Sequence, residues 1–213
     1  MMRWIVTAML IAGVLSGCQS TPAPEPAPLV VFLYGDSTRV FYEPYLRDLA
    51  GDTMEITSEG WYDGMTAASL LEKFQTDPVY QAAIRSSDVL HLNAGIHDAF
   101  RAVSPAAYRA DWAAILDLIV AANPDVRIVV ATSTVMELPG DANAFILAYN
   151  EELWDLARVY PQILINDLYG LQMDTPLVLM ADLIHFDEPS RMLMGAAVHA
   201  SILRAVSAES TRR

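Results

Sequence analysis

Runs of apolar residues recur along the chain, and segments with the periodicity of amphipathic helices lie between them. Residues 29–34 (LVVFLY) form an unbroken apolar run, and residues 89–94 (VLHLNA) form a second run rich in apolar side chains. A strand covered on both faces needs such a run, whereas a half-exposed strand alternates apolar with polar residues. Strands of this kind that alternate with helices form βαβ units. The sequence therefore predicts an α/β protein with a parallel sheet.

The same patterns give the expected order of elements. We expect five strands, at residues 29–34, 54–57, 89–94, 126–134 and 162–168. Between and after them we expect helices at residues 38–50, 65–74, 78–85, 105–122, 143–160 and 188–205. Five strands with crossover helices predict a flavodoxin-like three-layer α/β/α sandwich with a five-stranded parallel sheet. In such sheets the functional site lies at the carboxyl ends of the strands.

Composition limits the class of protein and its partners. The 213 residues are 54% hydrophobic and 18% charged, which suits one globular domain with a sizeable core. The 13 basic and 26 acidic residues give a formal net charge of −13. This acidic balance excludes nucleic acid as an expected partner, because phosphate binding needs a basic surface. The single cysteine excludes an intramolecular disulfide framework and a cysteine zinc site.

The N-terminal segment has the features of a lipoprotein signal peptide. Arg3 precedes an apolar run at residues 4–15, which is shorter than the roughly 20 residues of a membrane span. The run ends in Leu15-Ser16-Gly17-Cys18, which resembles the lipobox of bacterial lipoproteins. We therefore expect residues 1–17 to be removed and Cys18 to be lipidated. The alternatives are an ordinary signal peptide with an incidental cysteine and a buried N-terminal helix.

The residues after Cys18 indicate where the anchored protein resides. Gln19 follows the cysteine where Gram-negative sorting to the inner membrane uses aspartate, so the resemblance implies the outer membrane. Residues 19–28 (QSTPAPEPAP) hold four prolines and form an extended spacer. We therefore expect a lipidated cysteine and linker at residues 18–28, followed by the functional domain at residues 29–213. The protein is expected in the cell envelope, with the membrane as a partner through its lipid anchor.

Polar residues that suit nucleophilic catalysis follow the expected strands. Ser37 follows the first strand in Gly35-Asp36-Ser37, and Asp182 and His185 lie near the C-terminal helix. A serine, a histidine that takes its proton and a carboxylate that orients the histidine form a hydrolytic triad. Taken singly, Gly35-Asp36-Ser37 also suits a helix N-cap, and His185 also suits a buried structural histidine. We interpret His91 and His199 as packing residues.

These motifs together resemble the SGNH hydrolase family, also called the GDSL esterase/lipase family. The first block is FLYGDS at residues 32–37, the third is Gly95-Ile96-His97-Asp98, and the last is Asp182-Leu183-Ile184-His185. Residues 129–135 and 166–169 and the region of Asn150 also resemble a bacterial subgroup with G-x-H-D in the third block. The resemblance spans about residues 30–205. It implies Ser37 as the nucleophile, His185 as the general base and Asp182 as its orienting carboxylate.

The oxyanion hole implied by the resemblance combines the backbone N–H of Ser37 with that of a second-block glycine. Gly64 fits this position best, and Gly60 is the less favoured choice. The usual third-block asparagine is His97 here, whose imidazole can donate an N–H. Asn93, four residues earlier, is the other possible amide donor. We expect Asp98 to brace the loop rather than to react.

The resemblance implies a serine esterase that works through an acyl-enzyme and needs no cofactor. No two histidines have H-x-H or H-x-x-x-H spacing, so we expect no metal. The family includes lipases, thioesterases and carbohydrate acetylesterases, so the fold leaves the substrate open. Our first choice is removal of short acyl groups such as acetyl from a glycan or similar envelope substrate. The alternatives are a lysophospholipase-like lipid esterase and a catalytically silent envelope protein that binds acylated glycans.

Overall fold

The computed structural model describes residues 27–59 and 64–210, and five parallel strands form its centre. The strands are β1 (Leu29–Gly35), β2 (Met54–Ser58), β3 (Val89–Asn93), β4 (Arg127–Ala131) and β5 (Ile163–Asn166). Their order in the sheet is β2-β1-β3-β4-β5, and every neighbouring pair is parallel. This is the flavodoxin order, so the predicted fold class is confirmed. The predicted signal peptide, Cys18 and most of the linker lie outside the described residues.

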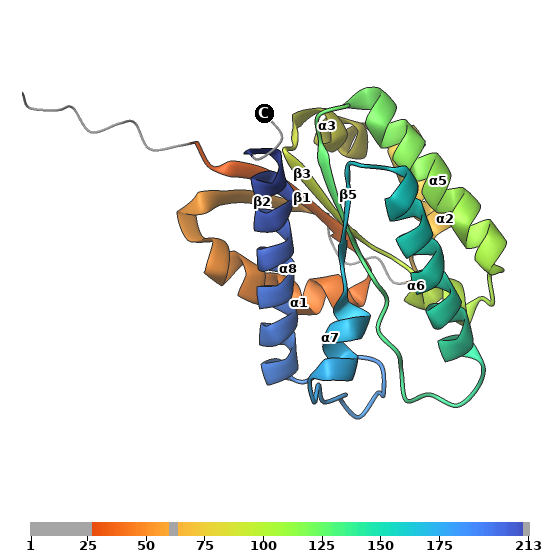
Figure 1. The fold of residues 1–213 in the computed structure, drawn as a ribbon. Coiled ribbons are helices and arrows are strands. Elements are labelled where there is room, and N and C mark those ends of the chain that lie inside the picture. The colour runs from red at the N-terminus through yellow and green to blue at the C-terminus, as the bar shows by residue number, and fades with distance from the viewer. Residues whose placement is uncertain (1–26, 60–63, 211–213) are drawn as a thin grey trace, which may run out of the picture.

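Helices cover both faces of the sheet (Figure 1). The described helices are α1 (Ser37–Ala50), α2 (Ala67–Thr76), α3 (Pro78–Ser86), α4 (Ile96–Phe100), α5 (Pro105–Ala122), α6 (Ala142–Val159), α7 (Leu168–Asp174) and α8 (Glu188–Ser210), with a 3-10 turn, η1, at Gly51–Thr53. Helices α1 and α8 pack together on one face, and α2, α3, α5 and α6 cover the other. None of the described helices is long and apolar enough to cross a membrane.

Each face of the sheet has its own hydrophobic core. Alternate residues of β3 separate the two, because successive side chains of a strand point to opposite faces. Leu90 and Leu92 join the larger core with Trp112 of α5, whereas Val89 joins the smaller core with Val198 of α8. These residues are fully buried. The sheet is thus fixed on both sides, and the loops at its carboxyl end are held at a defined position.

Two predicted strands are shorter than expected. Residues 126–134 were expected to form one strand, but β4 ends at Ala131 because the backbone of Ser133 pairs with a side chain. The N–H of Ser133 donates to Oδ1 of Asn150 (2.9 Å), and its carbonyl accepts from Nδ2 of the same side chain (2.9 Å). Residues 162–168 likewise give a strand only to Asn166, because Asp167 caps helix α7 by accepting from the N–H of Gly170 (2.9 Å).

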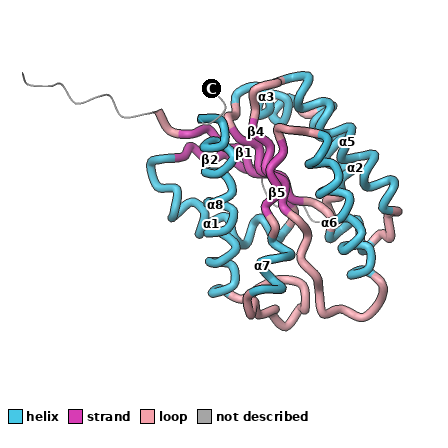
Figure 2. The backbone as a smooth tube through the Cα atoms, viewed as in Figure 1, coloured by secondary structure: helices cyan, strands magenta, loops and turns pink. Residues whose placement is uncertain are grey.

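Two short helices, α4 and α7, are absent from the predicted set. Each begins shortly after a strand ends, α4 at Ile96 after β3 and α7 at Leu168 after β5, and Figure 2 shows α7 among the loops at that end of the sheet. The helix expected at residues 65–74 begins instead at Ala67, because Thr66 is its N-cap and forms a reciprocal capping box with Ser69. The predicted cap at Ser104 is present, since its side chain accepts from the N–H of Ala107 (3.2 Å).

Candidate active site

Ser37 opens helix α1 immediately after strand β1, which lies between β2 and β3 in the sheet. Gly35 ends the strand, and a side chain at this position would meet Cβ of Arg39 at 2.7 Å, so the tight turn needs glycine. Asp36 is the N-cap, and its Oδ1 accepts from the N–H of Thr38 (3.0 Å). Ser37 therefore lies where the first backbone N–H groups of a helix lack partners within the helix. Ser37 also lies at the topological switch point between β1 and β3, where the strand order reverses. Ligands usually bind at this point in the fold.

The structure brings Ser37, His185 and Asp182 into one hydrogen-bonded chain. Oγ of Ser37 lies 2.6 Å from Nε2 of His185, and Nδ1 of His185 lies 2.8 Å from Oδ2 of Asp182. The second carboxylate oxygen of Asp182 accepts from the backbone N–H groups of Ile184 (3.0 Å) and His185 (2.9 Å). This is the geometry in which an imidazole can take a proton from a serine hydroxyl while a carboxylate fixes its tautomer.

The environment of Asp182 keeps its carboxylate ionised. Partial burial would raise its pKa, but the hydrogen bonds from the backbone and ring of His185 and from the backbone of Ile184 outweigh that effect. They lower the pKa of Asp182 to about 2. The Asp182 carboxylate can therefore accept the hydrogen bond from Nδ1 of His185 throughout the neutral pH range.

A closed turn holds the His185 loop in place. The N–H of Met180 donates to the carbonyl of His185 (2.6 Å), and the N–H of Leu183 donates to the carbonyl of Met180 (2.9 Å). Leu183 adopts a positive φ of 62°, a conformation that non-glycine residues rarely adopt. Its carbonyl accepts from the N–H of Glu137 (3.0 Å), which joins the loop to the segment after β4. The loop is thus fixed at both its own ends and its middle.

Phe41 supports the imidazole from the side of helix α1. Its ring meets that of His185 edge-on, with centroids 4.7 Å apart, and the guanidinium of Arg191 lies 4.9 Å from the centroid of Phe41. Such edge-to-face and cation–π contacts restrict ring orientation. Phe41 was not among the predicted site residues. Its spacing of four residues from Ser37 places both on one helix face, and that signal was available in the sequence.

Gly64 lies just before helix α2 with a φ of +82°, in the region that favours glycine. Asp98 ties the start of that helix to the third block. The two oxygens of Asp98 each lie 3.1 Å from the backbone nitrogen of Ala67 and accept its N–H. Burial raises the pKa of Asp98 to about 6, although the hydrogen bond from Ala67 works in the opposite direction. Asp98 thus holds the start of α2, which closely follows Gly64, against α4. The alternative glycine, Gly60, lies outside the described residues.

The structure separates the two candidate side-chain donors for the oxyanion. His97 lies on α4 and is partly exposed, and a positive charge on it would lower the pKa of the buried Asp36. Burial raises the pKa of Asp36, and the His97 charge works against that shift. Asn93 is 2% exposed and lies beside the Tyr42 hydroxyl beneath α1. Of the two, only His97 has access to the open end of the sheet.

The other histidines differ in burial, since His91 is packed in the core and His199 is partly exposed. His91 is fully buried and its ring meets that of Tyr42 edge-on, with centroids 6.1 Å apart. Burial and the nearby charge of Arg39 lower the pKa of His91 to about 3, so it is neutral near pH 7. His199 lies within helix α8. Among the described residues, no cluster of histidine, aspartate and glutamate has the geometry of a metal site.

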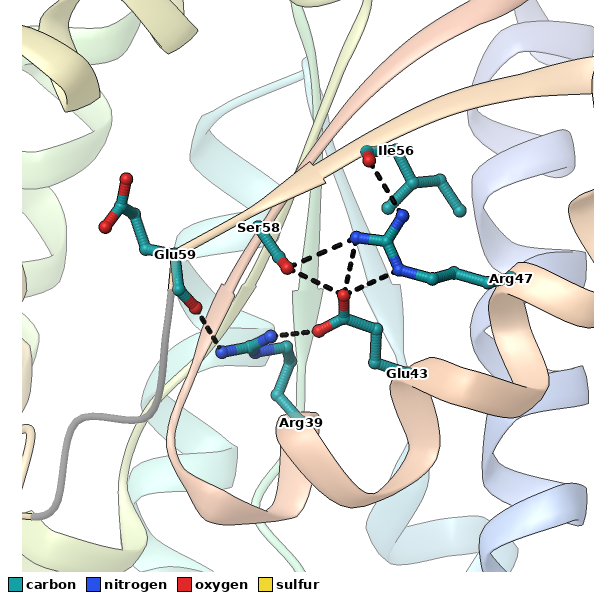
Figure 3. A network of polar contacts seen from close by, with 6 residues as sticks. All are labelled: Arg39, Glu43, Arg47, Ile56, Ser58 and Glu59. Carbon is teal, nitrogen blue, oxygen red and sulfur yellow. Dashed lines mark hydrogen bonds and ion pairs between the residues drawn. The ribbon is translucent and has the colours of Figure 1, made fainter.

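A buried network on helix α1 holds the end of β2 (Figure 3). Arg39 is 2% exposed, pairs with Glu43, and donates through Nη2 to the carbonyl of Glu59 (2.6 Å). Oε1 of Glu43 accepts from Oγ of Ser58 (2.6 Å) and Nε of Arg47 (2.8 Å). Burial opposes ionisation of Glu43, but these hydrogen bonds and the two arginine charges lower its pKa. The network therefore fixes the end of β2 at Ser58 and Glu59 to helix α1.

A match to a known family spans most of the described domain. The GDSL-like Lipase/Acylhydrolase family matches residues 32–189, from the first block to just beyond His185. The chain belongs to this family of SGNH hydrolases. As a family member it is a hydrolase that acts on ester bonds. No curated protein sequence matches the chain.

Solved structures of SGNH and related enzymes have the same fold. The chain is similar to the lipase/acylhydrolase from Enterococcus faecalis, with 18% identity, a TM-score of 0.64, and coverage of 82% of this chain and 95% of that one. It is similar to the catalytic domain of peptidoglycan O-acetyltransferase A from Streptococcus pneumoniae (17%, 0.64, 85% and 96%). It is also similar to a family 3 carbohydrate esterase from Clostridium thermocellum (15%, 0.65, 85% and 98%). At these identities the similarity concerns the fold.

Proposed function

We propose that this SGNH hydrolase is a serine esterase that removes short acyl groups, acetyl first, from a glycan or similar polymer of the cell envelope. The observation that carries the chemistry is the hydrogen-bonded chain from Ser37 through His185 to Asp182. In this proposal Nε2 of His185 takes the proton as Oγ of Ser37 attacks the ester carbonyl. The protonated imidazole then donates that proton to the departing alcohol, which leaves an acyl-enzyme on Ser37.

Deacylation repeats these steps with water as the nucleophile. His185 takes a proton from water, the resulting hydroxide attacks the acyl-enzyme, and Oγ of Ser37 leaves and regains its proton from His185. Asp182 accepts the Nδ1 hydrogen bond throughout and stabilises the imidazolium. We assign the negative charge on the carbonyl oxygen to the backbone N–H groups of Ser37 and Gly64 and to the His97 ring. We leave Asn93 out of this hole because it is buried beneath α1.

The choice of an acylated glycan draws on what the chain resembles. Among its structural neighbours are a carbohydrate esterase and a peptidoglycan O-acetyltransferase domain, both named for reactions on carbohydrate. The lipobox-like sequence at Cys18 and the proline-rich spacer support a lipid-anchored enzyme, which we place at the outer membrane of a Gram-negative bacterium. Palmitate labelling that is lost in Cys18→Ala would support this location, and unchanged labelling would contradict it.

A second candidate is a lipid esterase of the lysophospholipase kind. Val178 and Met180 precede Asp182 and expose 54% and 38% of their surfaces, so apolar side chains border the catalytic loop. Such a border suits a longer acyl chain. Carboxylic esters of one alcohol with acyl groups of two to eight carbons distinguish the candidates.

The experiment compares 4-nitrophenyl acetate with 4-nitrophenyl octanoate, and adds acetate release from O-acetylated peptidoglycan and acetyl xylan. Ser37→Ala is the matched control for each substrate. The proposal predicts a higher kcat/KM for acetate and acetate release from at least one polymer. Preference for octanoate would favour the lipid esterase. A folded protein that releases no acyl group from any substrate would contradict both and favour a silent glycan-binding protein.

A further inference from the structure

Arg101 places a guanidinium directly over Gly64. Its Nη2 lies 3.1 Å from the position that a Cβ on Gly64 would occupy. Arg101 follows helix α4, and its backbone N–H donates to the carbonyl of His97 (3.2 Å), one turn earlier. Residues four apart on a helix lie on the same side. The guanidinium is therefore held next to the glycine and the histidine that we assign to the oxyanion hole.

This guanidinium has no ion-pair or hydrogen-bond partner in residues 27–59 and 64–210. By contrast, Arg39 and Arg47 share Glu43, and Arg109 pairs with Glu152. The charge of Arg101 acts on Asp98, but that carboxylate is fully buried and its oxygens already accept from Ala67. Arg101 itself is exposed. Within the part of the chain that the structure describes, the guanidinium is thus a donor that can take a ligand.

The charge of the chain makes this position unusual. The formal net charge is −13, because acidic residues outnumber basic ones by 26 to 13. A basic group that could bind an anionic ligand at the site is therefore unusual. A guanidinium presents a planar set of N–H donors that matches a carboxylate in a bidentate arrangement. An arginine beside the reacting centre can therefore select substrates by a charged group away from the ester itself.

We propose that Arg101 binds a carboxylate on the substrate while the ester carbonyl lies at Ser37, so that the preferred substrates are acyl esters of acidic molecules. This inference rests on the proposed esterase function and makes Arg101 a specificity-determining residue. A role in the oxyanion hole alone would affect all esters alike. Selective recognition of a carboxylate affects only the esters that carry one.

The test uses rigid aryl acetates as probes. 4-Acetoxybenzoate and 3-acetoxybenzoate carry a carboxylate, and their methyl esters at that carboxylate are the neutral counterparts. The measured quantity is the ratio of kcat/KM for each acid to that for its methyl ester, corrected for the rates of alkaline hydrolysis. The variants are Arg101→Gln and Arg101→Glu. Arg85→Gln on helix α3 is the matched control. It also removes one positive charge, but Arg85 lies just before β3 begins, at the end of the sheet opposite to the active site.

We expect the ratio for at least one isomer to fall about 10-fold or more in Arg101→Gln, as for loss of a charge-assisted hydrogen bond. It should fall further in Arg101→Glu and stay unchanged in Arg85→Gln. Added salt should lower the ratio of the parent protein but not that of Arg101→Gln. A ratio unchanged in both Arg101 variants, or an equal loss on the acids and their methyl esters, would overturn the inference. Both results leave the esterase proposal standing, whereas a parent protein inactive on every probe counts against the esterase itself.

Discussion

Oγ of Ser37 lies 2.6 Å from Nε2 of His185, although 148 residues separate them in the chain. Ser37 is placed by the end of strand β1, and His185 by a closed turn just before helix α8. Helix α8 packs on helix α1, which begins at Ser37. The packing of these two helices therefore sets the distance between nucleophile and base.

Removing any one member of this chain should abolish most of the activity. We expect Ser37→Ala and His185→Ala each to lower kcat by about 10⁴-fold or more, because they remove the nucleophile or its base. Asp182→Asn should lower kcat by about 10³–10⁴-fold, because it disturbs the imidazole tautomer and removes a carboxylate that is ionised above pH 2. The measurement is steady-state hydrolysis of 4-nitrophenyl acetate. If the three residues act together, a double variant should lose little more kcat than the worse single variant. A double variant whose loss in kcat equals the product of the two single losses would contradict this.

The Arg39 network should affect turnover more than binding. Lysine cannot span both Glu43 and the Glu59 carbonyl, so Arg39→Lys should release the residue that follows β2 from helix α1. We expect kcat to fall about 10-fold with KM nearly unchanged, as for a small misplacement of catalytic groups. Arg47→Lys is the matched control, because Arg47 shares Glu43 and also reaches β2, at Ile56 and Ser58, but is far more exposed and does not contact Glu59. Equal effects of the two substitutions would argue against a positioning role for Arg39.

Asp98 should make stability depend on pH. Its pKa is about 6 in the folded protein, against an ordinary value of 3.8, so the folded state holds the proton more tightly. Stability is therefore lost as pH rises from about 4 to about 6. Asp98→Asn keeps an acceptor for Ala67 and removes the charge. We expect its free energy of unfolding, relative to the parent, to rise by about 2–3 kcal/mol between pH 4 and pH 7.

Urea denaturation at a series of fixed pH values measures this difference. Asp125→Asn, at an exposed carboxylate, serves as the control and should give a difference that changes little over the same range. A pH-independent difference for Asp98→Asn would mean that burial does not penalise the carboxylate.

His97 should act as an oxyanion donor. We expect His97→Ala to lower kcat by about 10²-fold, the usual loss when one such donor is removed. His97→Asn restores an N–H donor and should lose less. His199→Ala on helix α8 controls for loss of an imidazole elsewhere. If His97→Ala leaves kcat unchanged and Asn93→Ala lowers it, the donor assignment would pass to Asn93.

The sheet could be predicted because its strands are apolar on both faces, as at residues 29–34. The short helices α4 and α7 could not, since five and seven residues carry too little periodicity to distinguish a helix from a loop. Strand ends were also misplaced where a side chain replaces a backbone partner, as Asn150 does for Ser133. Such long-range pairing has no local signal.

The proposed triad could be predicted from sequence motifs, but the residues that surround it could be placed only from the tertiary structure. Arg39, Glu43 and Arg47 are spaced by four residues, so an ion-paired helix face was readable from the sequence. That this face reaches the carbonyl of Glu59 was not, because the contact crosses from helix to strand. The position of Arg101 over Gly64 likewise depends on a long-range contact, in which Asp98 of α4 accepts from the N–H of Ala67 at the start of α2.

Mass analysis of the folded domain after treatment with a fluorophosphonate, which modifies an activated serine, tests most directly whether Ser37 is the nucleophile. The account predicts a single adduct that peptide mapping assigns to Ser37 and that is absent in His185→Ala. An adduct on another residue, or none on a folded domain that keeps His185 and Asp182, would contradict it.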